Sequence, residues 1–294
     1  MATVLITGTS KGIGLSTALT LARSGHTVYA TMRTPAGAPE LAETAAKEKL
    51  PIVISAMDVD SDASVQTAIE EVYRQAGSID VLVNNAGIER NGSIEELPMD
   101  DFRAVMETNY FGAVRCAKAV IPRMRQRKSG CIINITSVAG RVSTSPLGPY
   151  AASKFALEAV SEALAQEMKA FNVRVAIVEP GIIETPMARS IEQPLSASLY
   201  PQQKRMAQYF AAVLSQPVNP PSLVAEKIKD IIESGTWQLR HPVGPTALPL
   251  LESRKTTSDE DYIALHGADD ETWYSVMEER TGLALRPEAE RSKA

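Results

Sequence analysis

Short apolar runs alternate with segments of helical periodicity from the N-terminus to about residue 178. The runs lie at residues 4–7, 27–32, 52–54, 79–83, 131–137 and 173–178, and residues 237–239 form a weaker seventh run. They are short and rich in β-branched residues, which is typical of strands buried in a parallel sheet. Strands that alternate with helices in this way predict an α/β fold.

The fifth run carries the strongest candidate for chemistry. It ends in Ser137, and Tyr150 and Lys154 follow at the start of a long helical segment. A spacing of four places two side chains on one helix face, with about 5–6 Å between their Cβ atoms. An ammonium favours a nearby phenolate, so Lys154 is expected to lower the pKa of Tyr150. Because open α/β sheets bind ligands at the carboxyl ends of their strands, these residues predict a site that interconverts a carbonyl and an alcohol.

The same Tyr-x-x-x-Lys spacing recurs at Tyr200 and Lys204. No buried strand that ends in Ser precedes Tyr200, and Pro201 favours an extended residue or a helix start at this point. We interpret this second pair as a coincidence of spacing.

A glycine-rich turn joins the first strand to the first helix. Its glycines follow the spacing G-x-x-x-G-x-G at Gly8, Gly12 and Gly14, and Ser10, Lys11 and Ile13 lie between them. Such glycines let backbone N–H groups approach a pyrophosphate at a helix N-terminus. Glycines also serve close packing of a strand on a helix, but the position at the first turn favours dinucleotide binding.

The second strand ends in Met32 and Arg33. NAD sites usually place a carboxylate near the end of this strand to bind the ribose 2′-hydroxyl, whereas an Arg accommodates the 2′-phosphate of NADP. The carboxylate is missing here, and Lys11 lies in the glycine turn on the same side as Arg33. Two solvated surface cations are the alternative explanation, but we predict NADP(H) as the cofactor.

Three further motifs stand at places where a ligand is expected. Asp58 follows the third strand, where it either caps the next helix or meets an adenine amino group. The sequence Asn84-Asn85-Ala86-Gly87 follows the fourth strand and suits a turn that a cofactor passes closely. Asn109 and Gly112 lie inside a helix predicted over residues 100–125, although both residue types disfavour helix interiors. This conflict indicates either function or close packing there.

Composition and charge exclude several classes of protein. The chain has 294 residues and a net charge of −5, and its Lys and Arg residues are scattered, which argues against a nucleic-acid partner. Two cysteines and three histidines give neither a disulfide framework nor metal-ligand spacing, so no metal is predicted. No apolar run approaches about 18 residues, and no signal-peptide pattern is present. We therefore expect a soluble, cytoplasmic protein without a membrane span.

Together these motifs resemble the short-chain dehydrogenase/reductase family. They are Thr-Gly-x-x-x-Gly-x-Gly, Asn-Asn-Ala-Gly, Asn-Ser-Tyr-Lys and Pro-Gly-x-x-x-Thr, in the family's order and spacing over residues 3 to about 187. The resemblance implies a Rossmann-type, doubly wound parallel sheet of seven strands in the order 3-2-1-4-5-6-7. It also implies assembly into a homodimer or a homotetramer.

The resemblance implies a role for each motif residue as well. In the catalytic set, Ser137 would orient the carbonyl, Tyr150 would exchange its proton and Lys154 would bind the nicotinamide ribose. Asn109 would complete this set by holding a water that links Lys154 to solvent, and Ile183 and Thr185 would fix the carboxamide. The implied cofactor-binding residues are Gly8, Ser10, Lys11, Gly12, Ile13, Gly14, Arg33, Asp58, Val59, Asn85, Ala86, Gly87, Tyr150, Lys154, Pro180, Gly181, Ile183 and Thr185.

After Met187 the family pattern weakens and prolines punctuate the chain. Apolar residues at helical spacing continue within this segment at Met206, Tyr209, Phe210, Val213 and Leu214. We expect a lid over about residues 187–222, because the segment leaves the sheet beside Thr185; a helix packed on the domain edge is the simpler alternative. The lid would belong to an oxidoreductase domain of residues 1–251.

The tail from residue 252 to residue 294 mixes acidic runs with aromatic residues. The aromatic residues argue against plain disorder, so we expect a partly ordered extension that docks on its own subunit or on a neighbour. Residues 286–294 are expected to be solvated. In outline, the C-terminal part is similar to the 17β-hydroxysteroid and retinol dehydrogenase branch of the family.

The sequence therefore predicts an NADP(H)-dependent oxidoreductase that transfers hydride between nicotinamide and a ketone or secondary alcohol. The substrate is expected to be bulky and apolar, as for a carbonyl reductase or a hydroxysteroid dehydrogenase. One alternative is a non-catalytic NADP(H)-sensing protein, which would have no need of the acid Tyr150. Another is an epimerase or dehydratase of the extended branch, whose Gly-x-x-Gly-x-x-Gly loop differs from the turn found here.

Overall fold

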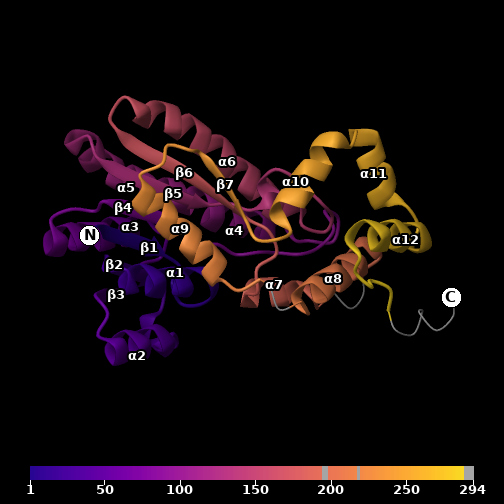
Figure 1. Cartoon of the computed structure of the whole chain (residues 1–294), viewed down its shortest axis with the longest axis horizontal. Helices are drawn as coiled ribbons and strands as arrows, with labels where there is room; N and C mark the ends of the chain where they lie inside the picture. The colour runs from indigo at the N-terminus through magenta and orange to yellow at the C-terminus, as the bar shows by residue number, and fades with distance from the viewer. Residues whose placement is uncertain (194–197, 217–218, 288–294) are drawn as a thin grey trace.

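A parallel sheet of seven strands forms the centre of the protein (Figure 1). The computed structural model describes residues 1–193, 198–216 and 219–287. The strand order is β3-β2-β1-β4-β5-β6-β7, so the predicted fold class is confirmed. The strands are β1 (Thr3–Thr7), β2 (Thr27–Met32), β3 (Ile52–Ala56), β4 (Val81–Asn84), β5 (Gly130–Ile135), β6 (Val173–Pro180) and β7 (Arg240–Val243).

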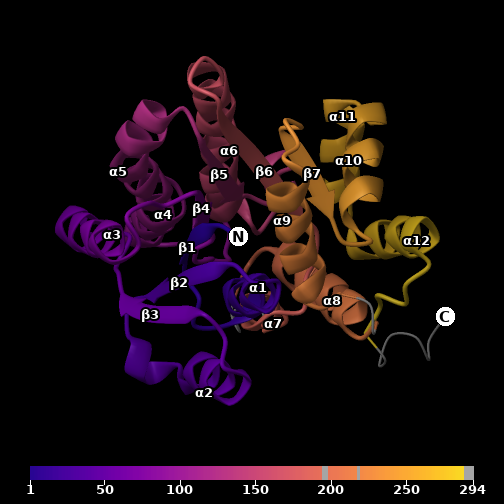
Figure 2. The ribbon, with the colours of Figure 1, turned by 60° about the vertical axis from the view of Figure 1, so that its left-hand side comes forward.

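Helices cover both faces of the sheet (Figure 2). Val4 and Ile6 of β1 pack in one core with α1 (Gly12–Arg23), α2 (Pro39–Glu48) and α9 (Ser222–Ser234). Leu5, between them, packs in the opposite core with α3 (Asp62–Ala76), α5 (Gly112–Arg127) and α6 (Gly148–Lys169). Successive strand residues point to opposite faces. The apolar runs are continuous because both faces are buried.

The seventh strand spans Arg240–Val243, so its prediction at residues 237–239 was wrong. This strand contains Pro242, which has no N–H group to donate and is tolerated because β7 lies at the edge of the sheet. Trp237, whose ring suggested a strand, is 43% exposed, and Nζ of Lys169 lies 3.5 Å from its ring centroid.

The helix predicted over residues 100–125 is interrupted by a π-helical turn. It consists of α4 (Met99–Met106), the π turn η2 (Glu107–Phe111) and α5. Asn109 lies in the π turn, a feature that often marks functional sites. Gly112 follows it, and a Cβ atom there would lie 2.8 Å from Cγ2 of Val59. Close packing therefore explains the glycine.

The expected lid contains two helices, α7 (Pro186–Ile191) and α8 (Pro201–Leu214). The apolar face predicted on α8 is present: Met206, Phe210, Val213 and Leu214 are buried in one cluster with Ile182. Tyr209 packs against the same cluster. Residues 194–197 and 217–218 of the expected lid lie outside the described residues.

The C-terminal extension forms helices and docks on its own subunit. Its helices are α10 (Ala247–Thr256), α11 (Asp259–Gly267) and α12 (Asp270–Thr281). Trp273 and Tyr274 are buried against Tyr209 of α8. Arg205, also on α8 and 2% exposed, donates to Asp270 at 2.7 Å and to the Ala268 carbonyl at 2.8 Å. Residues 288–294, expected to be solvated, lie outside the described residues.

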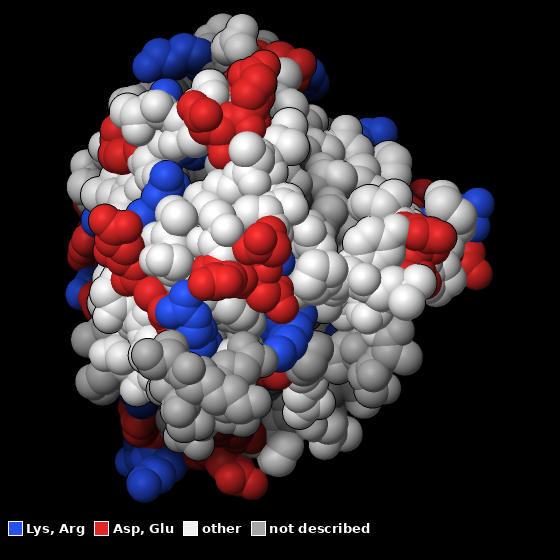
Figure 3. All heavy atoms as spheres, turned by 90° about the vertical axis from the view of Figure 1, so that its right-hand side faces the viewer, with Lys and Arg blue, Asp and Glu red and all other residues white. Residues whose placement is uncertain are grey.

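The surface over the C-terminal helices carries both signs of charge. Figure 3 shows Lys and Arg side chains interspersed with Asp and Glu on this face, rather than gathered into a basic stripe. Within the described part of the chain, no helix combines the length and the apolar character that a membrane crossing requires.

Candidate active site

A cavity of about 1020 Å³ extends from the glycine turn after β1 to the C-terminal helices. Every residue predicted above to bind the cofactor lines this cavity, and Ser137 lines it as well. Asn109 does not; it is 1% exposed and lies beneath the cavity wall, next to Gly87 and Lys154. The structure therefore brings together residues that are up to 177 positions apart, from Gly8 to Thr185.

The glycine turn is built for a group that approaches the backbone closely. Gly8 has a φ of +71°, and a Cβ atom there would lie 2.7 Å from Cα of Ala86. A Cβ atom on Gly14 would lie 2.3 Å from the Gly8 carbonyl oxygen and 2.5 Å from Nδ2 of Asn85. The first turn of α1 has no side-chain cap, so its backbone N–H groups stay available to an anion. These features fit the pyrophosphate of a dinucleotide.

We expect Gly14→Ala to raise the Kd for NADPH at least tenfold and to lower the free energy of unfolding by about 1–3 kcal/mol. The added methyl group would push apart the Gly8 carbonyl and the Asn85 amide, which shape the turn. Cofactor titration and chemical denaturation measure the two effects. Gly267→Ala is the matched control, because a Cβ atom there meets nothing within 4 Å. An unchanged Kd in Gly14→Ala would contradict the assignment of this turn.

The Asn-Asn-Ala-Gly motif ties β4 to the glycine turn. Nδ2 of Asn85 donates to the carbonyls of Thr7 at 2.9 Å and Gly8 at 3.0 Å, and the Ala86 N–H donates to Oγ1 of Thr7 at 2.9 Å. Both alternatives for Asp58 stay open. Ser61 caps α3, since its hydroxyl accepts from the Ser64 N–H, and Oδ1 of Asp58 accepts from the Asp60 N–H at 3.1 Å in the turn before this helix. Asp58 also lines the cavity.

The two cations of the expected 2′-phosphate site, Lys11 and Arg33, are exposed at the rim of the cavity. Across the described ranges, neither side chain has a hydrogen-bond or ion-pair partner. Met32, where an NAD site would carry a carboxylate, is 3% exposed and packs into the core. Asp60 lines the same end of the cavity, and the positive charge of Arg33 favours the ionised form of the Asp60 carboxyl group.

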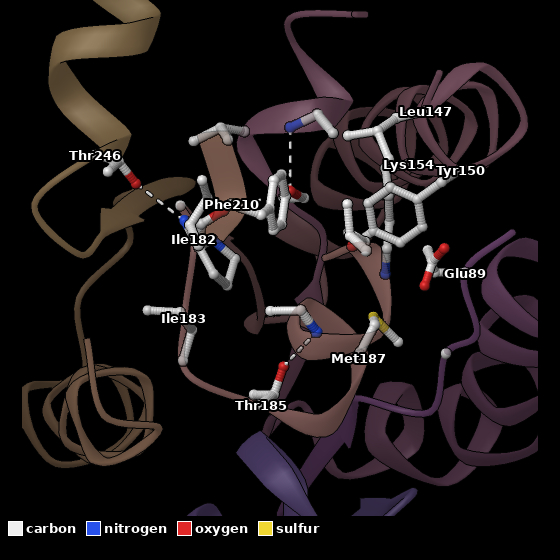
Figure 4. A pocket seen from close by; sticks show the side chains of 18 of the residues that line it. Glu89, Leu147, Tyr150, Lys154, Ile182, Ile183, Thr185, Met187, Phe210 and Thr246 are labelled. Atoms are coloured by element: carbon white, nitrogen blue, oxygen red, sulfur yellow. Dashed lines mark hydrogen bonds between the residues drawn. The ribbon is translucent and has the colours of Figure 1, made fainter. Parts of the chain in front are cut away.

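Ser137, Tyr150 and Lys154 line the cavity at the carboxyl end of β5, and Figure 4 shows Tyr150 and Lys154 side by side. Oγ of Ser137 accepts from the Ala139 N–H at 3.1 Å, which fixes the hydroxyl beside the cavity. Tyr150 and Lys154 extend from the first turns of α6, and Nζ of Lys154 lies 5.6 Å from the Tyr150 ring centroid. That nitrogen donates to the Ile135 carbonyl at 2.8 Å.

Burial sets the pKa values of this group. Burial raises the pKa of Tyr150 to about 12; the hydroxyl of Ser137 opposes this rise and the charge of Glu89 adds to it. Burial also lowers the pKa of Lys154 to about 8, partly offset by the nearby Glu158 carboxylate. The prediction that Lys154 lowers the pKa of Tyr150 is therefore not seen in this structure. Both groups are removed from water, and desolvation disfavours the charged form of each.

The side chain of Asn109 connects two parts of the site. Its Nδ2 donates to the Ile88 carbonyl and to Oγ of Ser153, both at 2.9 Å, and its Oδ1 accepts from the Ile88 N–H at 2.8 Å. These bonds fix the loop after β4 against the second turn of α6. Both amide protons are already used, so the predicted water would have to bind another group of Asn109.

The second Tyr-x-x-x-Lys pair lies outside this site. Tyr200 is the residue before α8 and donates from its hydroxyl to Glu95. Unlike Tyr150, it does not line the cavity.

Sequence reasoning missed several residues of the cavity wall. Glu89 lies two positions after the Asn-Asn-Ala-Gly motif, and an ionisable residue so close to a strand's carboxyl end was a usable signal. Oγ1 of Thr246 accepts a hydrogen bond from the Ile182 N–H at 2.9 Å, and this bond fixes the cavity wall after β6. Tyr262 and Trp273 of the C-terminal helices also line the cavity, and nothing local in the sequence assigned them to it.

The doubly wound sheet and its glycine turn place the protein among the Rossmann-type oxidoreductases. The sequence model of the family described as "short chain dehydrogenase" matches residues 2–196, and the chain belongs to this family. The family binds a nicotinamide cofactor.

Three relatives match different shares of the chain. A 3-ketodihydrosphingosine reductase from Bacteroides thetaiotaomicron is 41% identical over 182 residues, 62% of this chain and 64% of the relative. Retinol dehydrogenase 8 from Bos taurus is 41% identical over 204 residues, 68% of this chain and 64% of the relative. An NADPH-dependent pterin aldehyde reductase from Arabidopsis thaliana is 39% identical over 199 residues, 67% and 81% of the two chains. The chain thus covers less than two thirds of the length of the Bacteroides thetaiotaomicron and Bos taurus proteins.

Solved structures resemble nearly the whole chain. A short-chain dehydrogenase from Streptomyces avermitilis has a TM-score of 0.76 and 27% identity, covering 95% of this chain and 98% of that chain. A gluconate 5-dehydrogenase from Burkholderia cenocepacia, in complex with NADP and tartrate, has a TM-score of 0.70 and 26% identity, covering 86% and 95%.

Proposed function

We propose that this protein is an NADP(H)-dependent oxidoreductase that interconverts a bulky, apolar ketone and the corresponding secondary alcohol. The proposal rests on one observation: a single cavity is lined both by residues expected to bind the cofactor and by residues expected to act on the carbonyl group. The glycine turn and Arg33 line one end, and Ser137, Tyr150 and Lys154 line the middle.

The preference for NADP(H) rests on Lys11 and Arg33, two unpaired cations on the cavity rim within the described residues. It is supported by two of the relatives named above, one an NADPH-dependent reductase and the other bound to NADP. The bound cofactor would supply or accept hydride at its nicotinamide ring. The residues that would hold this ring are Ile183, Thr185 and Lys154.

The pKa values of the site indicate which residue donates the proton. With a pKa of about 12, Tyr150 is protonated at neutral pH and can donate to a carbonyl oxygen as that oxygen becomes a hydroxyl. Ser137 can donate a hydrogen bond to the same oxygen and orient it. Asn109 is a positioning residue, since it fixes the Ile88 loop and Ser153 around Lys154.

The apolar character of the substrate is proposed from the cavity walls. Leu147, Ile182, Met187 and Phe210 surround the space beside Tyr150 (Figure 4). Two relatives are named for ketodihydrosphingosine and retinol, names that agree with such walls. Cytoplasmic location and assembly as a homodimer or a homotetramer stay predictions.

Steady-state oxidation of NADPH in the presence of a panel of ketones and sterols tests the proposal. We expect turnover of at least one bulky ketone, with little turnover of acetone. Binding of NADPH without oxidation by any carbonyl compound would instead favour the sensing protein.

Phe210→Ala should raise KM for bulky apolar ketones about tenfold or more and change KM for acetone little. Phe210 is 8% exposed in the α8 cluster and lines the cavity, so its truncation removes apolar contact from large ligands only. KM measured for both ketones checks this. Ala211→Gly, on the exposed side of the same helix, is the control for a general loss of helix stability. An equal change for both ketones would mean that α8 is only structural.

A further inference from the structure

Glu89 is an acidic side chain in the part of the cavity that also holds Tyr150, Lys154 and several apolar side chains. It follows β4 by five residues and lines the cavity with Tyr150. Figure 4 shows its carboxyl on the side of the pocket where Tyr150 and Met187 lie. The neighbouring walls are the side chains of Leu147, Ile182 and Phe210. A carboxyl group gives such a pocket no apolar contact, so a different reason for its position is needed.

The contacts of Glu89 leave half of its carboxyl group open. Oε2 accepts from Oγ of Ser190 on α7 at 2.9 Å. Oε1 has no hydrogen-bond partner within the described ranges, and it keeps some accessible surface. The nearest cation in sequence, Arg90, is paired with Asp101 at 2.8 Å. Glu89 therefore presents one acceptor oxygen to a ligand.

The charge of Glu89 has no ion-pair partner among the described residues. Burial raises the pKa of Glu89, while Ser190 and Arg90 oppose the rise. A carboxylate that is partly removed from water is costly unless a cation or a donor meets it. A cationic ligand would supply that partner. Its position is also indicated, because Glu89 and Tyr150 line the same cavity and lie on the same side of it in Figure 4, so the cation would lie near the reacting carbonyl.

We infer that Glu89 selects carbonyl substrates that carry a protonated amine next to the carbonyl group, with an apolar remainder. The amine would donate to Oε1 of Glu89 while the carbonyl oxygen faces Tyr150 and Ser137. The apolar remainder would occupy the space between Leu147, Ile182 and Phe210. This inference rests on the proposed function, because it names the substrate class of the same site.

Three aryl ketones test the inference with the full-length protein and NADPH. α-Aminoacetophenone carries the amine, acetophenone lacks it, and α-hydroxyacetophenone replaces it with a neutral donor. We expect kcat/KM for α-aminoacetophenone to exceed that for acetophenone at least tenfold, mainly through KM, because hydrogen bonds to charged groups are of that strength. In Glu89→Gln the ratio should fall to near one. Using the ratio removes any change in Tyr150 that affects both ketones equally.

Glu95→Gln is the matched control. Glu95 lies on the same loop, is exposed and does not line the cavity, so the ratio should keep its native value. A ratio near one in the native protein, a high ratio that survives in Glu89→Gln, or a preference for α-hydroxyacetophenone over the amine would each overturn the inference. Turnover of acetophenone in those cases would leave the proposed function standing. No oxidation of NADPH or NADH by any of the three ketones would count against both.

Discussion

Replacing Tyr150 with Phe should lower kcat for ketone reduction by about 10²–10⁴-fold, the usual contribution of general acid–base catalysis. Phe fills nearly the same volume and lacks only the hydroxyl, so the packing of α6 should be retained. Affinity for NADPH should stay within a few-fold of its native value. Steady-state kinetics and cofactor titration measure the two quantities separately.

The pKa of Tyr150 determines how the rates of reduction and oxidation should change with pH. Burial raises the pKa of Tyr150 to about 12, so the acid form persists across neutral pH and into the alkaline range. Alcohol oxidation needs the base form, so its rate should increase as the pH rises toward that pKa. Parallel pH profiles for reduction and oxidation check this, and Tyr150→Phe should abolish the rise.

Tyr200→Phe is the control for this prediction. Tyr200 has the same Tyr-x-x-x-Lys spacing, but it contacts Glu95 and lies outside the cavity. Its turnover should stay close to the native value. If Tyr150→Phe retained native kcat, or if Tyr200→Phe lost as much as Tyr150→Phe, the assignment of the acid would be wrong.

The fold was predictable where burial imposes a regular pattern of apolar residues on the sequence. β2 was placed at residues 27–32, as the structure has it, because both of its faces are buried and every position is constrained. β7 was misplaced, because an edge strand is defined by its pairing with β6 and not by its own composition. The docking of α12 on α8 was left open, since Arg205, Asp270 and Trp273 meet only through tertiary packing.

The candidate site was predictable where its parts are close in sequence. The glycine turn and the Tyr150–Lys154 pair are local motifs, and the cavity contains both. Glu89 was missed although it follows the carboxyl end of β4 closely. Tyr262 was missed because its place in the wall depends on how α11 packs. The pKa of Tyr150 was predicted in the wrong direction for the same reason. Helical spacing reveals the neighbouring ammonium but not the burial, and burial is the larger effect.

NADPH should be preferred over NADH by roughly 10²–10⁴ in kcat/KM. The 2′-phosphate carries nearly two negative charges, which Arg33 can meet with a planar fork and Lys11 with a point charge. Hydrogen bonds to charged groups contribute about 1.5–3 kcal/mol each, so two contribute about 3–6 kcal/mol. At about 1.4 kcal/mol per tenfold, that energy range corresponds to the stated preference of roughly 10²–10⁴, and the exposure of both side chains to solvent favours its lower end.

Asp60 works against this preference and limits its size. Asp60 lines the same end of the cavity as Arg33, and the positive charge of Arg33 favours the ionised form of its carboxyl group. Burial raises the pKa of Asp60, while the hydroxyl of Thr108, 3.0 Å away, opposes the rise. A raised pKa moves the carboxyl toward its neutral form, which weakens its repulsion of a phosphate.

Arg33→Ala should therefore weaken NADPH binding tenfold or more and leave NADH binding almost unchanged. Lys47→Ala on α2 removes an exposed cation that does not line the cavity, so it should change neither cofactor's affinity. Met32→Asp is a poorer test, because Met32 packs in the core and a charge there would also destabilise the fold. The preference should shrink as ionic strength rises, since salt screens exposed charges. Equal kcat/KM values for NADH and NADPH in the native protein would show that Arg33 and Lys11 do not form a phosphate site.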